Sequence, residues 1–126
     1  MYYDNGDLQA EGSFKNDQKQ GLFRIYAEHK TLMRESTYVC DKLHGPYKEY
    51  YPNGRLKLDV DFKDDKKDGT VKWHYESGVV SCEGVYTDGK MNGRFKWYDE
   101  QGNLQTQEYY KDDQRIEEER PSNKDA

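Results

Sequence analysis

Apolar and polar residues alternate along this chain in short runs, and the runs recur with a period of 24 residues. Alternation with a period of two predicts β-strands that are apolar on one face and polar on the other. Four complete repeats start at Gly21, Gly45, Gly69 and Gly93. A fixed period of this length is typical of repeat proteins, in which each unit packs on its neighbours. The sequence therefore predicts one short β module that is repeated along the chain.

The same columns define the expected domain boundaries. We expect a partial repeat at 1–20, complete repeats at 21–44, 45–68, 69–92 and 93–116, and a disordered acidic and polar tail at 117–126. The N-terminal residues belong to the series because Asn5-Gly6 and Phe14 occupy the columns of Asn53-Gly54 and Phe62. Met1 thus falls inside a truncated repeat, which favours an origin in a longer protein.

Turn residues divide each repeat into two antiparallel strands. Asn5-Gly6 and Asn53-Gly54 predict two-residue type I′ turns, because such a turn needs a positive φ at both central residues. Weaker signals of the same kind are Ser77-Gly78 and Gln101-Gly102. The corresponding His29-Lys30 lacks the glycine, so we expect a longer or strained turn in that repeat.

A two-residue turn also determines which residues face each other across a hairpin. Counting outward from Asn53-Gly54 places Lys48 opposite Asp59. The same count in the other repeats gives the pairs Arg24–Glu35, Lys72–Glu83 and Lys96–Gln107. Exposed ion pairs of this kind contribute only about 0.2–1 kcal/mol each, so they support the register more than the stability.

The opposite face is predicted to be apolar and to hold the repeats together. Its expected members are Phe23, Tyr47, Val71, Phe95, Leu32, Leu56, Val80, Leu104, Tyr38, Phe62, Tyr86 and Tyr110. If the linkers between hairpins turn as tightly, aromatic rings cover the strand glycines in the pairs Phe14–Gly21, Tyr38–Gly45, Phe62–Gly69 and Tyr86–Gly93. The fold class is therefore all-β, an elongated single-sheet array of about nine to ten antiparallel strands. The apolar face is covered either by its own coiling or by a partner.

Composition by itself is ambiguous, because 36% charged and 33% hydrophobic residues lie near the disordered class. The twelve tyrosines, four phenylalanines and two tryptophans recur in register, which indicates a folded array. No apolar run is long enough for a transmembrane helix and no N-terminal stretch resembles a signal peptide, so we expect a cytoplasmic location. Cys40 and Cys82 occupy different columns, which predicts reduced thiols.

No catalytic or metal-binding constellation recurs with the repeat. His29, His44 and His74 fall in unrelated columns, so we interpret them as surface or turn residues. Acidic linker tips are possible Ca²⁺ ligands, but turn propensity explains them without a metal. These tips are Asn16-Asp17, Asp64-Asp65, Asp88-Gly89 and Asp112-Asp113. With no phosphate loop, nucleophile elbow or dinucleotide fingerprint in the sequence, we expect no enzyme activity, no cofactor and no metal.

A net charge of −5 argues against nucleic acid and anionic membranes as partners. An acidic column lies beside the basic column and neutralises most of it. The basic column is Arg24, Lys48, Lys72 and Lys96. Tyrosines can stack on bases, but the tyrosine columns of this chain fit the apolar face. A protein partner is therefore favoured.

The repeat pattern resembles a known family. Residues 45–62 and 69–90 follow most closely the pattern G-x-aromatic-K-x-Y-Y-x-N-G-x-L-x-x-E-x-x-Y-x-D-G-K, which is similar to the variant MORN repeat of bacterial proteins, including those called YwqK-family antitoxins. The resemblance covers residues 1–116 and departs from the pattern at His29-Lys30, Asp99 and Gln107. It implies an array of β-hairpins and a role as an antitoxin or immunity protein that caps a basic toxin.

Three functions fit these observations. The first is a protein-binding module, whose candidate contact residues are Trp73, Trp97, Tyr51 and Tyr75. The second is a structural spacer within a larger MORN-repeat protein, and a third, weaker alternative is attachment to a membrane surface or lipid. Exposed strands at the two ends of the sheet are also suited to pairing with another copy. The sequence leaves the identity of the partner and the oligomeric state open.

Overall fold

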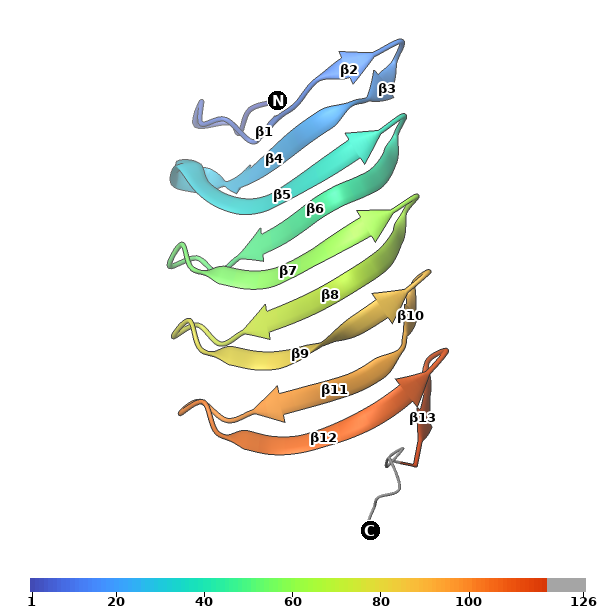
Figure 1. The fold of residues 1–126 in the computed structure, drawn as a ribbon. Helices are drawn as coiled ribbons and strands as arrows, with labels where there is room; N and C mark the ends of the chain where they lie inside the picture. Colours follow the sequence, from blue (N-terminus) through green and yellow to red (C-terminus); the bar gives the residue numbers. More distant parts are fainter. Residues whose placement is uncertain (118–126) are drawn as a thin grey trace.

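The computed structural model describes residues 1–117, and these form an array of β-hairpins stacked along one direction (Figure 1). Its strands are β1 Ala10–Glu11, β2 Phe14–Lys15, β3 Gln18–Lys19, β4 Gly21–Ala27, β5 Thr31–Val39, β6 Lys42–Tyr50, β7 Leu56–Lys63, β8 Lys66–His74, β9 Val80–Thr87, β10 Lys90–Met91, β11 Gly93–Tyr98, β12 Leu104–Lys111 and β13 Gln114–Ile116. One 3-10 turn, η1 Glu28–Lys30, joins β4 to β5. Within residues 1–117, no helix is long and apolar enough to cross a membrane.

Eleven of the strands form a single antiparallel sheet, and β2 pairs with β3 separately. The strand order is β1-β4-β5-β6-β7-β8-β9-β11-β12-β13, with β10 beside β9, so neighbours in the sheet are also neighbours along the chain. The predicted all-β single-sheet array is confirmed. The count is slightly higher than expected because β10 and β13 are short segments at the bend of the array. Residues 118–126, most of the predicted tail, lie outside the described residues.

The charged register is confirmed in all four hairpins. Lys48 lies opposite Asp59, and the other predicted pairs, Arg24–Glu35, Lys72–Glu83 and Lys96–Gln107, also face each other. Each basic residue also has an acidic neighbour from the preceding repeat, in the pairs Arg24–Glu11, Lys48–Glu35, Lys72–Asp59 and Lys96–Glu83. One continuous row of alternating charge therefore crosses the sheet.

The predicted type I′ turn at Asn53-Gly54 is wrong, although the register that it implied is right. Gly54 alone has a positive φ, of 90°, and its N–H donates to the carbonyl of Tyr51 at 2.9 Å. The Tyr51 N–H donates to the carbonyl of Arg55 at 2.8 Å, so the loop has three residues. A bulge then adds Lys57 to β7, because Glu49 pairs with Leu58 whereas Tyr50 pairs with Leu56. The longer loop and the bulge compensate each other, and the outer residues pair as predicted.

Tight turns with two residues of positive φ lie instead at the linkers between hairpins. Lys63 pairs directly with Lys66, and Asp64 and Asp65 between them have φ of 50° and 70°. The same geometry recurs at Asn16-Asp17, Cys40-Asp41, Asp88-Gly89 and Asp112-Asp113. Asparagine and aspartate tolerate this left-handed region better than most residues, which explains the acidic linker tips.

The turn at His29-Lys30 is not longer than the others, since Ala27 pairs with Thr31 and three residues lie between them. It is strained as expected, because His29 and Lys30 have φ of 68° and 70° without being glycine. The turn has the length of its glycine-containing counterparts but a different shape, because His29 also has a positive φ whereas the equivalent Asn53 does not.

The aromatic residues predicted to cover the strand glycines face different glycines. The observed pairs are Gly21–Tyr38, Gly45–Phe62, Gly69–Tyr86 and Gly93–Tyr110, which lie within one hairpin rather than across a linker. Across the linker the register shifts after the pair Phe62–Lys67. These glycines are needed for their backbone, because φ lies between 89° and 114°, whereas a Cβ at Gly21 or Gly93 would meet nothing within 4 Å.

The apolar face covers itself at its centre. Its buried side chains are Leu58, Val60, Val71 and Phe95, and Val60 and Val71 are only 1% exposed. Partly buried neighbours pack against them, namely Tyr47, Phe62, Trp73, Cys82, Tyr86, Met91, Trp97 and Tyr110. A single sheet can bury side chains this completely only if it bends around them. Within the described residues the sheet supplies its own cover.

Part of the predicted apolar face lies outside this buried cluster. Leu32, Leu56, Val80 and Leu104 pair with Tyr26, Tyr50, His74 and Tyr98 next to the turns. The bulge between these positions and the centre of each strand interrupts the alternation of faces, and Leu104 is 49% exposed. Assigning these four residues to the core was therefore wrong.

Large and small side chains alternate across the centre of the sheet. The row reads Phe23, Ser36, Tyr47, Val60, Val71, Gly84 and Phe95 from strand to strand. A Cβ built on Gly84 would overlap the ring of Phe95, and one on Gly12 would overlap Phe23. Aromatic rings do cover strand glycines, as predicted in principle, but at Gly84 and Gly12 rather than in the glycine column that starts each repeat.

Exchanging volume within this row tests the packing. Gly84→Val is expected to destabilise the protein by about 1–3 kcal/mol, because the added side chain overlaps the Phe95 ring. The double variant Gly84→Val, Phe95→Val should lose less than the sum of the single changes, by about 1 kcal/mol or more, since Val60 and Val71 already pack side by side. Denaturant unfolding measures all three variants. Additive losses would contradict this account of the row.

Candidate binding groove

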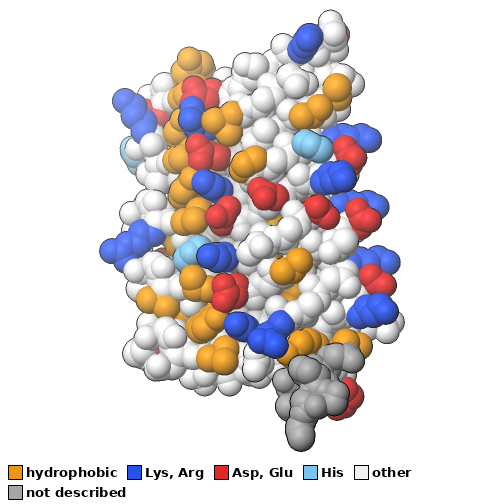
Figure 2. All heavy atoms as spheres, in the orientation of Figure 1, with side chains coloured by type: hydrophobic (Ala, Val, Ile, Leu, Met, Phe, Trp, Pro, Cys, Tyr) orange, Lys and Arg blue, Asp and Glu red, His pale blue; other side chains and the backbone are white. Residues whose placement is uncertain are grey.

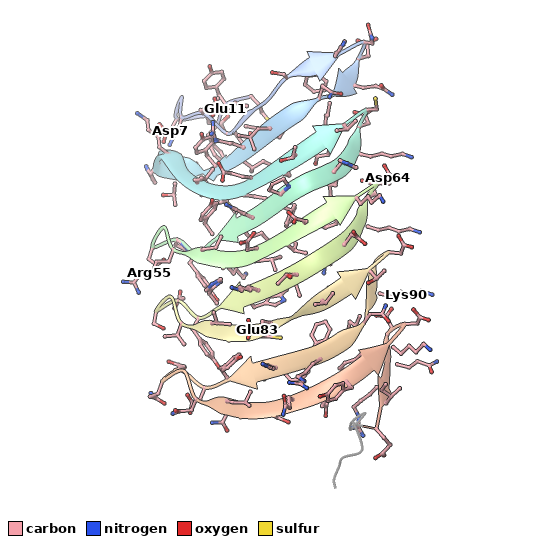
Figure 3. All side chains as sticks on the ribbon, viewed as in Figure 1. Asp7, Glu11, Arg55, Asp64, Glu83 and Lys90 are labelled. Atoms are coloured by element: carbon pink, nitrogen blue, oxygen red, sulfur yellow. The ribbon has the colours of Figure 1, made fainter. Side chains whose placement is uncertain are left out.

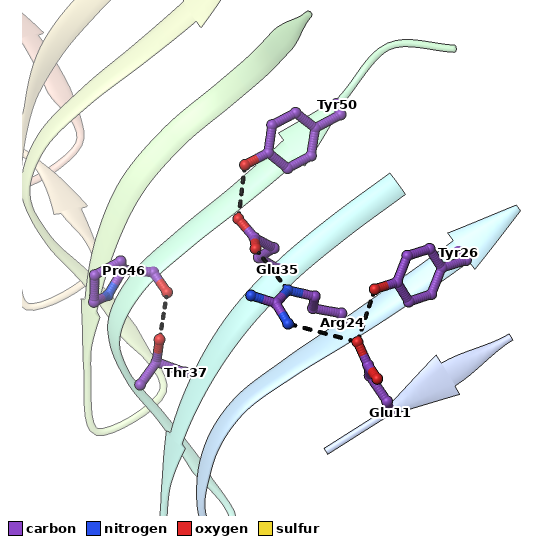
Figure 4. A network of polar contacts seen from close by, with 7 residues as sticks. All are labelled: Glu11, Arg24, Tyr26, Glu35, Thr37, Pro46 and Tyr50. Atoms are coloured by element: carbon purple, nitrogen blue, oxygen red, sulfur yellow. Dashed lines mark hydrogen bonds and ion pairs between the residues drawn. The ribbon is translucent and has the colours of Figure 1, made fainter. Parts of the chain in front are cut away.

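Polar side chains on the charged face bind one another (Figure 4). Arg24 lies between two carboxylates, with its Nη1 3.5 Å from Glu11 Oε2 and its Nε 3.0 Å from Glu35 Oε2. Tyr26 donates its hydroxyl hydrogen to Glu11 Oε2 at 2.7 Å, and Tyr50 donates to Glu35 Oε1 at 2.7 Å. In a later repeat, Tyr98 donates to Glu83 at 2.5 Å. On the face seen in Figure 2, charged side chains of both signs intermingle with hydrophobic ones.

These contacts shift the pKa values of their members. Hydrogen bonds from Tyr50 and Arg24 lower the pKa of the Glu35 carboxyl. Burial, and then the hydrogen bond to Glu35, raise the pKa of Tyr50 to about 12. Tyrosine hydroxyl groups thus hold Glu11, Glu35 and Glu83 in a structural network, to which Arg24 adds bonds at Glu11 and Glu35.

A second set of tyrosines joins successive repeats. Tyr51 donates its hydroxyl hydrogen to the carbonyl of His74 at 2.5 Å, and Tyr75 donates to the carbonyl of Tyr98 at 2.6 Å. Tyr3 makes the same contact with the carbonyl of Tyr26 at 2.6 Å. Two of the four predicted contact residues, Tyr51 and Tyr75, therefore also have a structural role.

The acidic linker tips bind the backbone of the preceding repeat. Asp65 accepts the N–H of Leu43 at its Oδ1, at 2.7 Å, and donates its own N–H to the Leu43 carbonyl at 2.9 Å. Asp41 and Asp113 make the same pair of bonds with Lys19 and Met91. Between residues 1 and 117, no group of three or more His, Cys, Asp or Glu side chains is arranged to hold a metal ion. Turn geometry and these bonds account for the acidic tips.

The three histidines lie in different surroundings. His29 is in a turn with its side chain 85% exposed, and His44 is exposed on β6. His74 lies in β8 and its Nδ1 is buried without a hydrogen-bond partner in the described part of the chain. The surface or turn interpretation of His74 was wrong. The imidazole occupies the column of Tyr50 and Tyr98, whose hydroxyl groups reach a carboxylate.

All four predicted contact residues line one groove of about 490 Å³. Its lining consists of Tyr51, Trp73, His74, Tyr75, Ser81, Cys82, Trp97, Tyr98 and Gln105. Trp73 on β8 and Trp97 on β11 both lie directly opposite Cys82 on β9, so the two indoles flank one thiol. Trp97 also rests against Phe95, with ring centroids 6.3 Å apart. The core thus positions the wall of the groove.

Sequence reasoning missed Cys82, Tyr98, His74, Ser81 and Gln105 as members of this groove. A signal existed for Cys82, because the count outward from Ser77-Gly78 pairs it with Trp73. Cys82 and Trp97 pair across the linker between β9 and β11. The sequence does not indicate the shift in strand register at a linker, so this pair could not be predicted. For Ser81 and Gln105 there was no signal, since both are residues added at a bulge.

No charged side chain is among the residues that line the groove. Burial raises the pKa of the Cys82 thiol, and the neighbouring Glu83 carboxylate adds to the shift. Asp99 lies beyond the groove and accepts hydrogen bonds from the backbone of Asn103 and Gln101 and from the Gln105 side chain, which lower its pKa. In Figure 3, Arg55 lies on the side of the array where the turns within the hairpins are stacked. Asp64 and Lys90 lie on the opposite side, where the linkers between hairpins are stacked. The groove is an uncharged aromatic surface bordered by turns that carry acidic side chains and Arg55.

Comparison with known proteins agrees with the repeat pattern. The model of a family described as the MORN repeat variant matches residues 1–16, 43–64, 67–88 and 91–112, which is more than half of the chain. Residues 17–42 are unmatched and contain the turn with His29 and Lys30, yet they fold as the same hairpin. No protein among the curated ones matches the chain. The resemblance inferred from the glycine and aromatic columns is confirmed.

The Tyr50–Glu35 hydrogen bond predicts a stability change at alkaline pH. Because the folded-state pKa of Tyr50 is raised from 10 to about 12, its contribution is complete below pH 10 and is lost as the pH rises through about 12. Glu35→Gln should lower the pKa of Tyr50 part of the way toward 10 and reduce the stability lost in this window. Carbon NMR of labelled tyrosine gives the pKa, and denaturant unfolding across this pH range gives the stability.

Tyr98 is the internal control for this experiment, because its partner is Glu83 and its pKa should not change in the Glu35→Gln protein. An unchanged pKa of Tyr50 in that variant would show that burial alone raises it.

Proposed function

Because the chain belongs to the MORN repeat variant family, we propose that it is a non-catalytic repeat module that binds another protein through the groove of Trp73 and Trp97. The single observation that carries this proposal is the groove itself, in which two indoles and three tyrosines from neighbouring repeats converge without a charged side chain. Tryptophan and tyrosine in such hollows commonly dominate the energy of protein interfaces.

The charged face is a less suitable contact surface. Its carboxylates already accept hydrogen bonds from tyrosines and from Arg24. A partner that binds there would gain little, because exposed ion pairs contribute little energy. The aromatic groove can contribute more, since its binding energy comes from burial of apolar area.

The family resemblance and the net charge of −5 support a more specific role, that of an antitoxin or immunity protein that caps a basic toxin. An acidic surface attracts a basic protein and accelerates its association. We also propose a cytoplasmic location. Cys40 and Cys82 are not joined in a disulfide, which suits a reducing compartment.

Capture from a lysate of the source organism tests the groove. The wild-type chain should retain a stoichiometric protein that a Trp73→Leu, Trp97→Leu double variant loses, because leucine keeps apolar bulk against the buried cluster but removes the rings. The fold of the variant is checked by circular dichroism, and bound proteins are identified by mass spectrometry.

Phe14→Leu is the matched control, since Phe14 is an aromatic residue that is 64% exposed and lies outside the groove. It should retain the partner. If the wild-type chain captures nothing, the alternative of a structural spacer is favoured. If the double variant captures the same protein as the wild type, the contact surface lies elsewhere.

Charge steering has a separate kinetic test. The association rate with the captured partner should fall by about tenfold or more between low and high ionic strength, while the dissociation rate changes little. Glu76→Gln, Glu100→Gln should slow association at low salt, because both side chains are exposed at turns beside the groove. Association that is insensitive to salt would count against a basic partner but not against the groove.

A further inference from the structure

The chain places its own cations over aromatic rings at several positions. Lys19 Nζ lies 4.8 Å from the ring centroid of Tyr38, and Lys67 Nζ lies 5.0 Å from that of Tyr86. Lys57 Nζ lies 5.7 Å from the ring centroid of Tyr51. A cation within about 6 Å of a ring centroid is attracted by the negative face of the ring. The aromatic columns of this protein are thus repeatedly paired with ammonium groups.

One of these cations lies at the margin of the groove, because Tyr51, the ring beneath Lys57, is a lining residue. The equivalent position of the next repeat has no cation. Lys57 and Ser81 occupy the same column, 24 residues apart, and so do Tyr51 and Tyr75. Lys57 is the residue added at the bulge of β7, and Ser81 is added at the equivalent bulge of β9. The serine hydroxymethyl group is too short to reach over the ring of Tyr75 as Lys57 reaches over Tyr51.

The groove also has aromatic rings at a position where the earlier repeats have none. Trp73 and Trp97 occupy the column in which earlier repeats have Ile25 and Glu49. Indole is the aromatic side chain that attracts cations most strongly. No contact between a Lys or Arg side chain and either indole ring is found in residues 1–117. The two rings best suited to a cation therefore have none from the described part of the chain.

We propose that the groove binds a lysine or arginine side chain of the partner protein, held against Trp73 and Trp97 in the place that corresponds to the ammonium group of Lys57. This inference rests on the proposed function, because it takes the cation to belong to the bound protein. Complementary charge supports it, since Glu76, Asp99 and Glu100 at the adjoining turns outnumber the cations beside the groove, Arg55 and Lys57, and the chain carries a net charge of −5. A cationic occupant also suits a hollow whose own lining is uncharged.

Two small compounds that differ only by the terminal ammonium group test the charge requirement on the full chain. The probes are N-acetyl-lysine-N-methylamide and its uncharged analogue N-acetyl-norleucine-N-methylamide, titrated at constant ionic strength. The chain has two tryptophans, so nitrogen NMR resolves one indole N–H signal for each. The lysine compound should shift both signals saturably, and the norleucine compound should bind about tenfold more weakly.

A matched pair of variants tests the site. Ser81→Lys restores the residue type of Lys57 and should fill the groove, which abolishes the shift caused by the lysine compound. Ser81→Gln introduces the long uncharged residue that Gln105 supplies in the next repeat, and it should retain binding. Circular dichroism establishes that both variants are folded.

Absence of a shift up to the solubility limit of the lysine compound overturns the proposal, and so does an equal response to norleucine. Binding to the Ser81→Lys variant as strong as to the wild type also overturns it. The proposed function is judged separately by capture. If the tryptophan double variant loses the partner but Ser81→Lys retains it, protein binding stands and the cation site is wrong.

Discussion

The structure depends on burying side chains in a sheet that has no second layer. Neighbouring strands lie about 4.8 Å apart, so the side chains that face each other in one row across the sheet share little space. The chain solves this by alternating volume across the sheet, with Ser36 between Phe23 and Tyr47 and with Gly84 beside Phe95. In the repeat that has Val71 in place of the aromatic residue, the facing residue is Val60, which is larger than the serine or glycine of the other repeats. Bending around this row buries its centre.

The turns and the bonds between repeats maintain that bend. Positive φ at the glycines that start each repeat allows the strands to change direction, and the linker turns tie each repeat to the one before it through paired backbone bonds such as those of Asp65 with Leu43. At the other edge, Tyr51 and Tyr75 bind the backbone of the following repeat. Each unit is thereby held by its neighbours, as in other repeat proteins. These bonds also hold the strands β8, β9 and β11, which form the groove, in fixed positions.

The proposed binding groove lies where the repeats differ rather than where they agree. The columns shared by every repeat build the hairpins, the core and the charged ladder. The groove arises because one column changes from Ile25 and Glu49 to Trp73 and Trp97, while the bulge residue shortens from Lys57 to Ser81. These substitutions leave the fold unchanged and create a local aromatic hollow, so the same scaffold can carry different contact surfaces in different proteins.

The sequence by itself determined the period and the register at the centre of each hairpin, because alternation and the pairing of Lys48 with Asp59 are local consequences of the pattern. Beyond the bulges next to the turns it assigned residues such as Leu56 to the wrong face. It also indicated Trp73, Trp97, Tyr51 and Tyr75, which converge in one groove. The turn type could not be read, since a three-residue loop with a bulge leaves the outer pairs in the register of a two-residue turn. Which glycines lie beneath rings, and that Trp97 joins Trp73 at Cys82, depended on register shifts across the linkers. Only the tertiary structure decides these shifts, because they are set by how successive hairpins pack around the buried row and not by the residues of any one hairpin.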